Sequence, residues 1–263
     1  MTANIEASPV MSGLIDYCER CAPGFAGLLR PSSPGDVEDV ISLIGLPLPV
    51  EYRSFLLAFG RSDPLTLAPF MADIEFGCDA IEDFYRAPPV PVPSDAAYLW
   101  TASGDCEMFL GVAGEWAVDH PVVSFSWPVD DATGKFLSHD RLPFIVSCSL
   151  PAFLYREAYS KLRVRNLAYH YSLRENVAPG AERTESAAAE RGRRFVAVME
   201  NLGLRPLPFL DPNVLIYDRA DVAVSMFVSV IAEDALHVDA SDAREASLVT
   251  EILCDNLGAR RFG

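Results

Sequence analysis

The first clear pattern along the chain is a pair of short amphipathic helices. Apolar residues recur at spacings of three and four over residues 37–44, which predicts a helix with one buried stripe. Ser33 precedes this stripe as a capping residue, and Gly45 marks its end. The same spacing recurs over residues 52–59 and stops at Gly60, so a second helix follows directly.

Beyond residue 60 the hydrophobic period changes to two, which is typical of half-buried strands. Apolar and polar residues alternate over residues 108–112 and 123–127, and shorter candidates occupy residues 74–76 and 98–101. Turns rich in small and polar residues separate these segments, so we predict an antiparallel meander. A helix starting at residue 150 is expected to close this part of the fold.

The last third of the chain is predicted to be helix, sheet and helix. A helical stripe runs over residues 195–202, and three strands are expected at residues 214–217, 222–228 and 235–239. A capping-box pattern then opens a final helix over residues 242–258.

The composition changes to Ala, Glu and Arg over residues 174–194. We therefore expect a first domain over residues 1–165, a linker over 166–186 and a C-terminal α+β domain over 187–263. The predicted fold class is α+β, with an antiparallel sheet flanked by helices, followed by a smaller α/β C-terminal domain.

Charge is unevenly distributed along the chain. The 263 residues carry 37 Asp and Glu against 21 Lys and Arg, a net charge of -16, while half of them are apolar. This balance excludes a disordered protein and argues against nucleic acid as a partner. Residues 1–160 hold 22 acidic and 8 basic residues, whereas residues 161–263 hold 15 and 13. The acidity belongs to the first domain, so a basic partner is expected.

The sequence indicates a cytoplasmic protein without a cofactor or metal. The first 15 residues lack the pattern of a secretory signal, and the longest nearly apolar stretch, residues 222–232, is too short to span a bilayer. Cys18 and Cys21 form a CxxC pair without a second pair at zinc-site spacing, and the histidines form no metal motif. A dispersed Ser-His-Asp triad stays open, which leaves a hydrolase as a third alternative.

The second predicted helix carries a family resemblance. The segment from residue 48 to residue 60 resembles the signature of the SUKH superfamily through Leu48, Pro49, Glu51, Tyr52, Phe55, Leu56 and Gly60. Residues 98–112, with a turn at 103–105, and residues 121–123 resemble that family's strands, and residues 149–159 its closing helix. The resemblance covers about residues 30–160.

The resemblance implies an α+β fold and a mostly non-enzymatic role. The superfamily includes immunity proteins that bind and neutralise bacterial polymorphic toxins, often nucleases, and a fungal cell-wall assembly regulator. We therefore expect an immunity protein that binds a basic, nuclease-type toxin through an acidic surface. The alternative is a scaffold or regulatory protein with a cellular partner, and a homodimer is compatible with either role.

The expected contact residues are carboxylates flanking an aromatic side chain in turn-like sequence, with Trp116 as the preferred binding hot spot. They are Glu75, Asp79, Glu82, Asp83, Asp105, Glu107, Glu115, Trp116 and Asp119. The opposing interpretation is that these carboxylates only solvate loops and that Trp116 belongs to the core.

Overall fold

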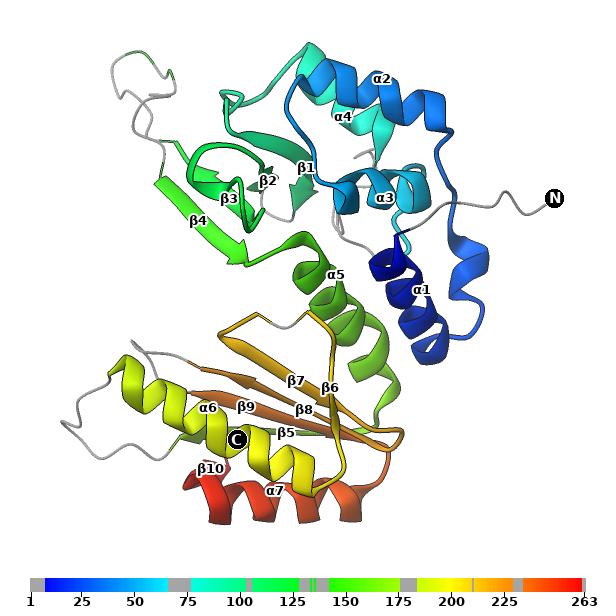
Figure 1. Ribbon diagram of the computed structural model, residues 1–263. Coiled ribbons are helices and arrows are strands. Elements are labelled where there is room, and N and C mark those ends of the chain that lie inside the picture. The colour runs from blue at the N-terminus through cyan, green and yellow to red at the C-terminus, as the bar shows by residue number, and fades with distance from the viewer. Residues whose placement is uncertain are drawn as a thin grey trace. The chain divides into compact units, whose positions relative to one another are not determined.

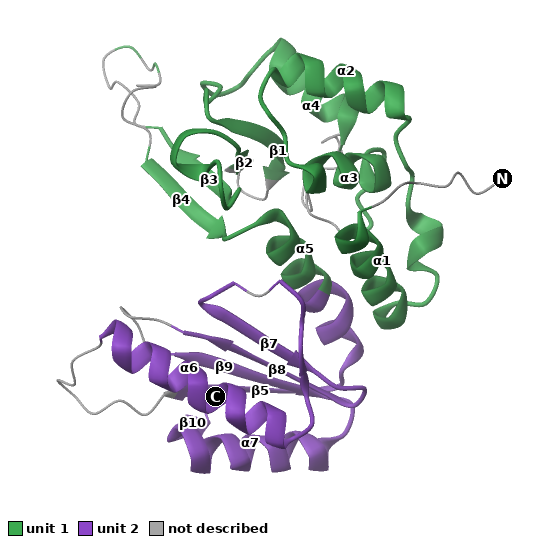
Figure 2. Cartoon of the chain, in the orientation of Figure 1, with its two compact units in different colours: residues 1–158 green, residues 159–263 purple. Residues whose placement is uncertain are grey.

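The chain divides into two compact units, residues 1–158 and 159–263 (Figure 2). The computed structural model describes residues 8–65, 77–102, 106–127, 133, 135, 142–175, 184–209, 211–228 and 234–261. Within these ranges, none of the helices has both the length and the apolarity needed to cross a membrane.

Unit 1 combines helices with a four-stranded antiparallel meander in the order β1-β2-β3-β4 (Figure 1). Its elements are α1 Pro9–Cys21, η1 Phe25–Leu28, α2 Pro34–Ile44, α3 Val50–Phe59, α4 Cys78–Arg86, β1 Ala96–Ala102, β2 Cys106–Gly111, η2 Gly114–Trp116, β3 Val122–Ser126, β4 Leu142–Ser147 and α5 Leu150–Ala158. The predicted meander and closing helix are confirmed. The strand expected at residues 74–76 and the turn at 103–105 lie outside the described residues.

Helix α2 begins and ends where the sequence predicts. The Ser33 hydroxyl accepts a hydrogen bond from the Asp36 amide, and the Asp36 carboxylate accepts one from the Ser33 amide, which completes a capping box. Gly45 ends the helix in the left-handed conformation at φ 68°.

Helix α3 places the family-like motif in the core. Tyr52 and Phe55 are buried, and the Tyr52 hydroxyl donates a hydrogen bond to the Tyr98 carbonyl of β1 at 2.7 Å. Gly60 is sterically required, because a Cβ atom there would lie 2.2 Å from both the Leu56 carbonyl and the Ser32 hydroxyl. The motif therefore fixes α3 against the sheet.

Unit 2 is a six-stranded antiparallel sheet with two helices on one face (Figure 1). Its elements are η3 Tyr159–Arg163, η4 Val164–Asn166, β5 Tyr169–Glu175, α6 Glu185–Asn201, β6 Arg205–Pro206, β7 Val214–Asp218, β8 Val222–Phe227, β9 Ala235–Ala240, α7 Ala243–Leu257 and β10 Ala259–Arg261. The strand order is β10-β5-β9-β8-β7-β6. The predicted helices α6 and α7 and strands β7, β8 and β9 are confirmed.

The expected linker at residues 166–186 differs from the structure. Residues 169–175 form β5, an inner strand that pairs with β9 on one side and β10 on the other. Leu173 of β5 is buried in the core of unit 2, and this burial is the physical reason for the strand. The boundary between the units falls at residue 158 instead of 165.

Candidate partner-binding surface

The expected contact residues at 79–83 lie on helix α4, not in a turn. The Phe84 ring stacks on the Tyr98 ring of β1, with centroids 3.9 Å apart, so this side of the helix faces the sheet. Asp79 and Asp83 are exposed, and Glu82 is partly buried. The structure thus brings these three carboxylates together on one short helix.

A single guanidinium partly neutralises helix α4. Arg86 donates hydrogen bonds to the carboxylates of Glu82 and Asp83, the latter with Nη1 and Oδ1 3.4 Å apart. Such exposed pairs contribute little to stability because water and salt screen them. Three carboxylates against one cation leave α4 acidic.

Helix α2 packs beside α4 and adds carboxylates that the sequence analysis did not include (Figure 1). Glu38 and Asp39 are both exposed, and Glu38 forms an ion pair with Arg53. The sequence could have indicated these two carboxylates, because they lie on the polar face of a helix whose apolar stripe was predicted correctly. The exposed carboxylates of the two helices are therefore Glu38, Asp39, Asp79 and Asp83.

The turn between β2 and β3 overturns one prediction. Glu115 and Asp119 are exposed as expected, but the Trp116 side chain is only 7% exposed. Its ring lies against Phe125 of β3, with centroids 5.7 Å apart. The assignment of Trp116 as a binding hot spot is therefore wrong, because the indole belongs to the core.

Glu107 is also buried, at 8% exposure on β2. It was expected as a surface contact, and this is wrong because the residue sits within the meander, where a partner has little access to it. Two other expected contacts, Glu75 and Asp105, lie outside the described residues.

Among the described residues of unit 1, strand β4 brings together three exposed large apolar side chains. Leu142, Phe144 and Ile145 are 67%, 70% and 60% exposed. Successive side chains of a strand point to opposite faces, so β4 presents apolar groups on both of its faces. The sequence analysis missed this strand because its five apolar residues do not alternate with polar ones.

Strand β4 is also the edge of its sheet. It pairs with β3 on one side, from Leu142 opposite Ser126 to Ser147 opposite Val122, and no described strand pairs with its other side. Pro143 carries no amide hydrogen, and the Val146 carbonyl accepts a hydrogen bond from Arg156 of α5 at 2.9 Å. An exposed apolar edge of this kind is a common site for pairing with another chain.

The Cys18 thiol of unit 1 is held in a protonated, weakly reactive state. Burial raises the pKa of the Cys18 thiol to about 12, so this thiol stays protonated at neutral pH and is a poor nucleophile or metal ligand. Within the described residues, no three His, Cys, Asp or Glu side chains are grouped so that they could hold a metal ion. Cys18 of the CxxC pair is buried on α1, and Cys21 is partly exposed.

Unit 2 contains a serine–histidine contact that bears on the hydrolase alternative. The Ser172 hydroxyl lies 3.2 Å from Nδ1 of His237. The nearby Asp239 carboxylate contacts His170 Nδ1 at 2.8 Å and accepts a hydrogen bond from the Tyr159 hydroxyl at 3.2 Å. Asp239 is thus engaged by His170 and not by His237, and the arrangement differs from a Ser-His-Asp relay.

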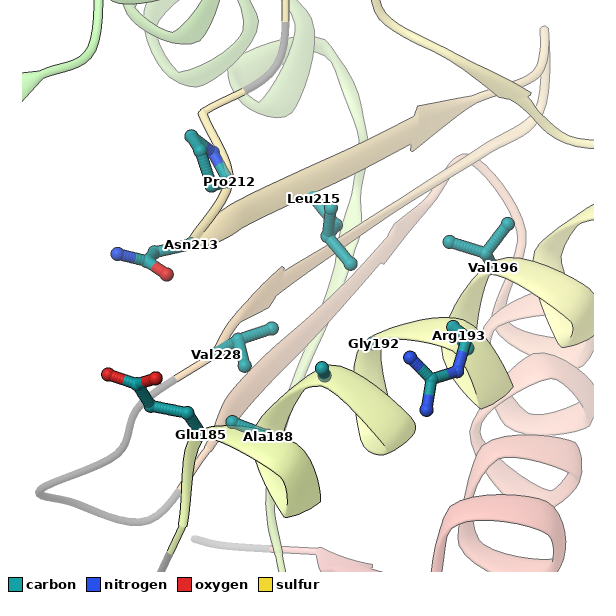
Figure 3. Close-up of a pocket in the computed structure, with 10 residues that line it drawn as sticks. Glu185, Ala188, Gly192, Arg193, Val196, Pro212, Asn213, Leu215 and Val228 are labelled. Carbon is teal, nitrogen blue, oxygen red and sulfur yellow. The ribbon is translucent and has the colours of Figure 1, made fainter.

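A groove of about 610 Å³ lies between α6 and the sheet of unit 2 (Figure 3). It exists because Ala188 and Gly192 of α6 leave space opposite Leu215 and Val228. Arg193 at its rim bonds Glu190 of the same helix at 2.7 Å. The lining is mainly apolar, so the groove presents no cluster of catalytic groups.

Comparison with protein-family models, with curated proteins and with solved structures finds no match to this chain.

Proposed function

We propose that this protein is an immunity protein that binds a basic toxin domain without catalysing a reaction, using unit 1 as the binding module. The observation that carries this proposal is the exposed apolar edge strand β4 on a strongly acidic unit. Its cellular location under this proposal is the cytoplasm, where an immunity protein meets the toxin.

The apolar part of the proposed interface is the edge formed by Leu142, Phe144 and Ile145. Covering large aliphatic and aromatic side chains is the main source of binding free energy in protein interfaces. Apart from Pro143, which has no amide hydrogen, and the Val146 carbonyl, which accepts from Arg156, the outer edge of β4 can add main-chain hydrogen bonds to an extended segment of the partner. Both the apolar side chains and the strand edge favour a protein partner over a small substrate.

The acidic residues of unit 1 give the proposed interface its negative charge. Unit 1 holds 22 acidic and 8 basic residues. Arg53, Arg61 and Arg86 already form ion pairs with carboxylates, which leaves most of the negative charge uncompensated. A toxin that cuts nucleic acid needs a basic cleft, and an acidic protein associates with such a cleft rapidly.

The resemblance described above gives further support. The elements α2, α3, β1, β2, β3 and α5 of unit 1 follow one another in the order that the resemblance implies, and unit 1 has α1, α4 and β4 in addition to them. The motif residues Tyr52 and Phe55 are buried in the core. A motif of this kind specifies the fold and leaves the surface residues to determine which partner is bound.

The alternative is a scaffold or regulatory protein that uses the same surface for a cellular partner. The same apolar edge favours it, because β4 is suited to pairing with any extended chain. A third reading as a hydrolase has less support, since Asp239 contacts His170 and not His237.

The test is affinity capture of the tagged protein from its own cells at low and moderate salt, with mass spectrometry of the bound proteins. A Phe144→Lys, Ile145→Lys double variant should lose the captured partner. The matched control is Leu248→Lys, because Leu248 is an exposed apolar residue, at 49% exposure, but lies on α7 of unit 2, outside the proposed binding module.

Capture of one basic protein, toxic when expressed alone and harmless when co-expressed, would support the immunity function. Capture of a housekeeping complex without protection would favour the scaffold. Equal capture by the β4 variant and by wild type would remove β4 from the interface.

A further inference from the structure

The turn between β2 and β3 presents an apolar side chain to solvent. Val118 is 85% exposed, more than any other large apolar side chain among the described residues. A side chain this exposed adds almost nothing to the hydrophobic core, so folding does not require an apolar residue there. Single exposed apolar residues are common on protein surfaces, and the construction of the turn decides whether this one has a role.

The turn is held in one conformation by contacts at both of its ends. The Trp116 ring packs against Phe125 of β3, and the Trp116 carbonyl accepts a hydrogen bond from the His120 amide at 3.1 Å. Nδ1 of His120 lies 3.1 Å from the Gly111 carbonyl oxygen. The Gly111 amide in turn donates a hydrogen bond to the Pro121 carbonyl at 2.9 Å. These contacts tie the end of β2 to the start of β3.

The backbone of His120 is strained. Its φ is 49°, in the left-handed region that residues with a side chain rarely adopt. A residue keeps such a conformation only where its surroundings hold it, and such residues are concentrated at binding and catalytic sites. Because the turn is already ordered, a partner that contacts Val118 loses little conformational entropy in fixing it.

Two carboxylates lie on either side of Val118 in the turn. Glu115 and Asp119 are both exposed, and within the described residues neither side chain forms an ion pair or a hydrogen bond. The neighbouring strand ends are also described: β1 begins at Ala96, opposite the last residue of β2, and β4 ends at Ser147, opposite the first residue of β3. The negative charge of both carboxylates is therefore available to a partner.

We propose that the β2–β3 turn inserts Val118 into an apolar pocket of the basic partner, with Glu115 and Asp119 paired to lysine or arginine side chains on the rim of that pocket. This inference rests on the proposed function, because it takes unit 1 as the module that binds a basic protein. An apolar anchor in a pocket, surrounded by polar groups, is the arrangement from which protein interfaces gain most of their binding free energy. In this interface Val118 has the anchoring role that Trp116 was expected to have.

Charge complementarity selects this partner over the other candidates. Carboxylates form strong, charge-assisted hydrogen bonds with guanidinium and ammonium groups. They repel phosphate groups, which disfavours nucleic acid and an anionic membrane surface. A second copy of this chain is also disfavoured, because residues 1–160 hold 22 acidic and 8 basic residues and would repel their own kind.

The test is site-specific photo-crosslinking of the full, tagged chain in its own cells. p-Benzoylphenylalanine replaces Val118 in one variant, Phe144 of β4 in a second and Leu248 of α7 in a third. Leu248 is the matched control, because it is exposed and apolar but belongs to unit 2. After irradiation, the protein is purified under denaturing conditions and the crosslinked peptides are identified by mass spectrometry. The variant at 118 should form an adduct with one basic protein, at a peptide that contains or adjoins lysine or arginine.

Charge reversal beside the crosslinker tests the role of the two carboxylates. Adding Glu115→Lys and Asp119→Lys to the variant at 118 should lower the adduct yield by about threefold or more. Adding Glu251→Lys and Asp255→Lys, the same change of charge on α7, should lower it less. Circular dichroism and a thermal melt of each variant establish that the fold survives.

The crosslinks distinguish this inference from the proposed function. An adduct from position 144 without one from 118 would overturn the inference and leave the proposed function standing, whereas no adduct from either position would remove both. An adduct from 118 without one from 144 would support the inference and remove β4 from the interface. The inference would also be overturned by the same adducts from 118 and 248, by an adduct between two copies of this chain, or by an adduct with an acidic peptide.

Discussion

The indole of Trp116 lies directly over the α-carbon of Gly111. A Cβ atom built at position 111 would stand 2.7 Å from Trp116 Cβ and 2.8 Å from its Cε3. Gly111 is the last residue of β2, and Trp116 lies in η2 within the turn between β2 and β3, so their contact closes that turn onto the sheet. The absence of a side chain at 111 is what allows the indole to be buried there.

We therefore expect Gly111→Ala to destabilise the protein by about 1–3 kcal/mol, because the added methyl group overpacks the site. Urea unfolding followed by tryptophan fluorescence measures the change. Gly27→Ala is the control, since a Cβ atom at position 27 meets nothing within 4 Å. An unchanged midpoint for Gly111→Ala would show that the indole does not occupy this position in solution.

This contact also shows why surface residues were harder to predict than the fold. Trp116 is flanked by Glu115 and by polar turn residues, so its sequence context resembles that of an exposed aromatic residue. Its burial depends on Phe125 and Gly111, which reach it only through the pairing of β2 and β3. Local sequence contains no direct information on that pairing.

The elements that were predicted correctly have strong local signals. Helix α2 has a capping box at Ser33 and a terminal glycine at Gly45, and the motif helix α3 has its aromatic stripe. Strand β5 was missed although Tyr171 and Leu173 alternate with polar residues, because the composition around it suggested a linker. Strand β4 was missed because it is apolar throughout and yet exposed, a combination that secondary-structure patterns do not anticipate.

Charge reversal on the β2–β3 turn tests the electrostatic part of the proposed interface. A Glu115→Lys, Asp119→Lys variant should slow association with the captured basic partner by roughly threefold to tenfold at low salt. The salt dependence of the association rate should also become flatter, because fewer charges steer the encounter. Stopped-flow fluorescence at several salt concentrations measures both effects.

The control for this variant carries the same change of charge elsewhere. Glu251 and Asp255 are exposed and one turn apart on α7 of unit 2. A Glu251→Lys, Asp255→Lys variant should leave the association rate closer to that of wild type. Equal effects of the two variants would mean that net charge, and not the β2–β3 turn, controls association.

Alkaline pH should weaken unit 1. Burial raises the pKa of Cys18 from 9.0 to about 12, and burial likewise raises the pKa of Tyr98 and Tyr155 from 10.0 to about 12. At a pH between the ordinary pKa and the raised pKa of each group, the unfolded chain releases a proton that the folded chain retains. The free energy of unfolding therefore falls as pH rises. The stabilisation is complete below pH 9 and is lost progressively towards pH 12.

Urea unfolding at intervals from pH 7 to pH 11 measures this loss. Cys18→Ala removes the thiol, so this variant should lose less stability than wild type between pH 8.5 and pH 10, a range set by the pKa of Cys18 in the two states. Identical pH profiles for the two proteins would contradict the assignment of a buried, protonated thiol.

The boundary between the units leads to the last prediction. Strand β5 lies between β9 and β10 in the sheet, and the Arg163 guanidinium donates hydrogen bonds to Asp218 and to the carbonyls of Arg219 and Ala220. A fragment of residues 187–263 lacks β5 and Arg163, so β10 loses the strand with which it pairs and one edge of β9 is left open. A fragment of residues 159–263 retains all of these contacts.

We therefore expect the longer fragment to unfold in one cooperative transition and the shorter one to melt without a defined transition. Thermal melts followed by circular dichroism compare the two. Arg163→Met in the longer fragment should lower its stability by about 2–4 kcal/mol, because the change leaves the Asp218 carboxylate and two carbonyls without this donor. A cooperative melt of residues 187–263 would instead place the boundary after β5 and make that strand dispensable to the fold of unit 2.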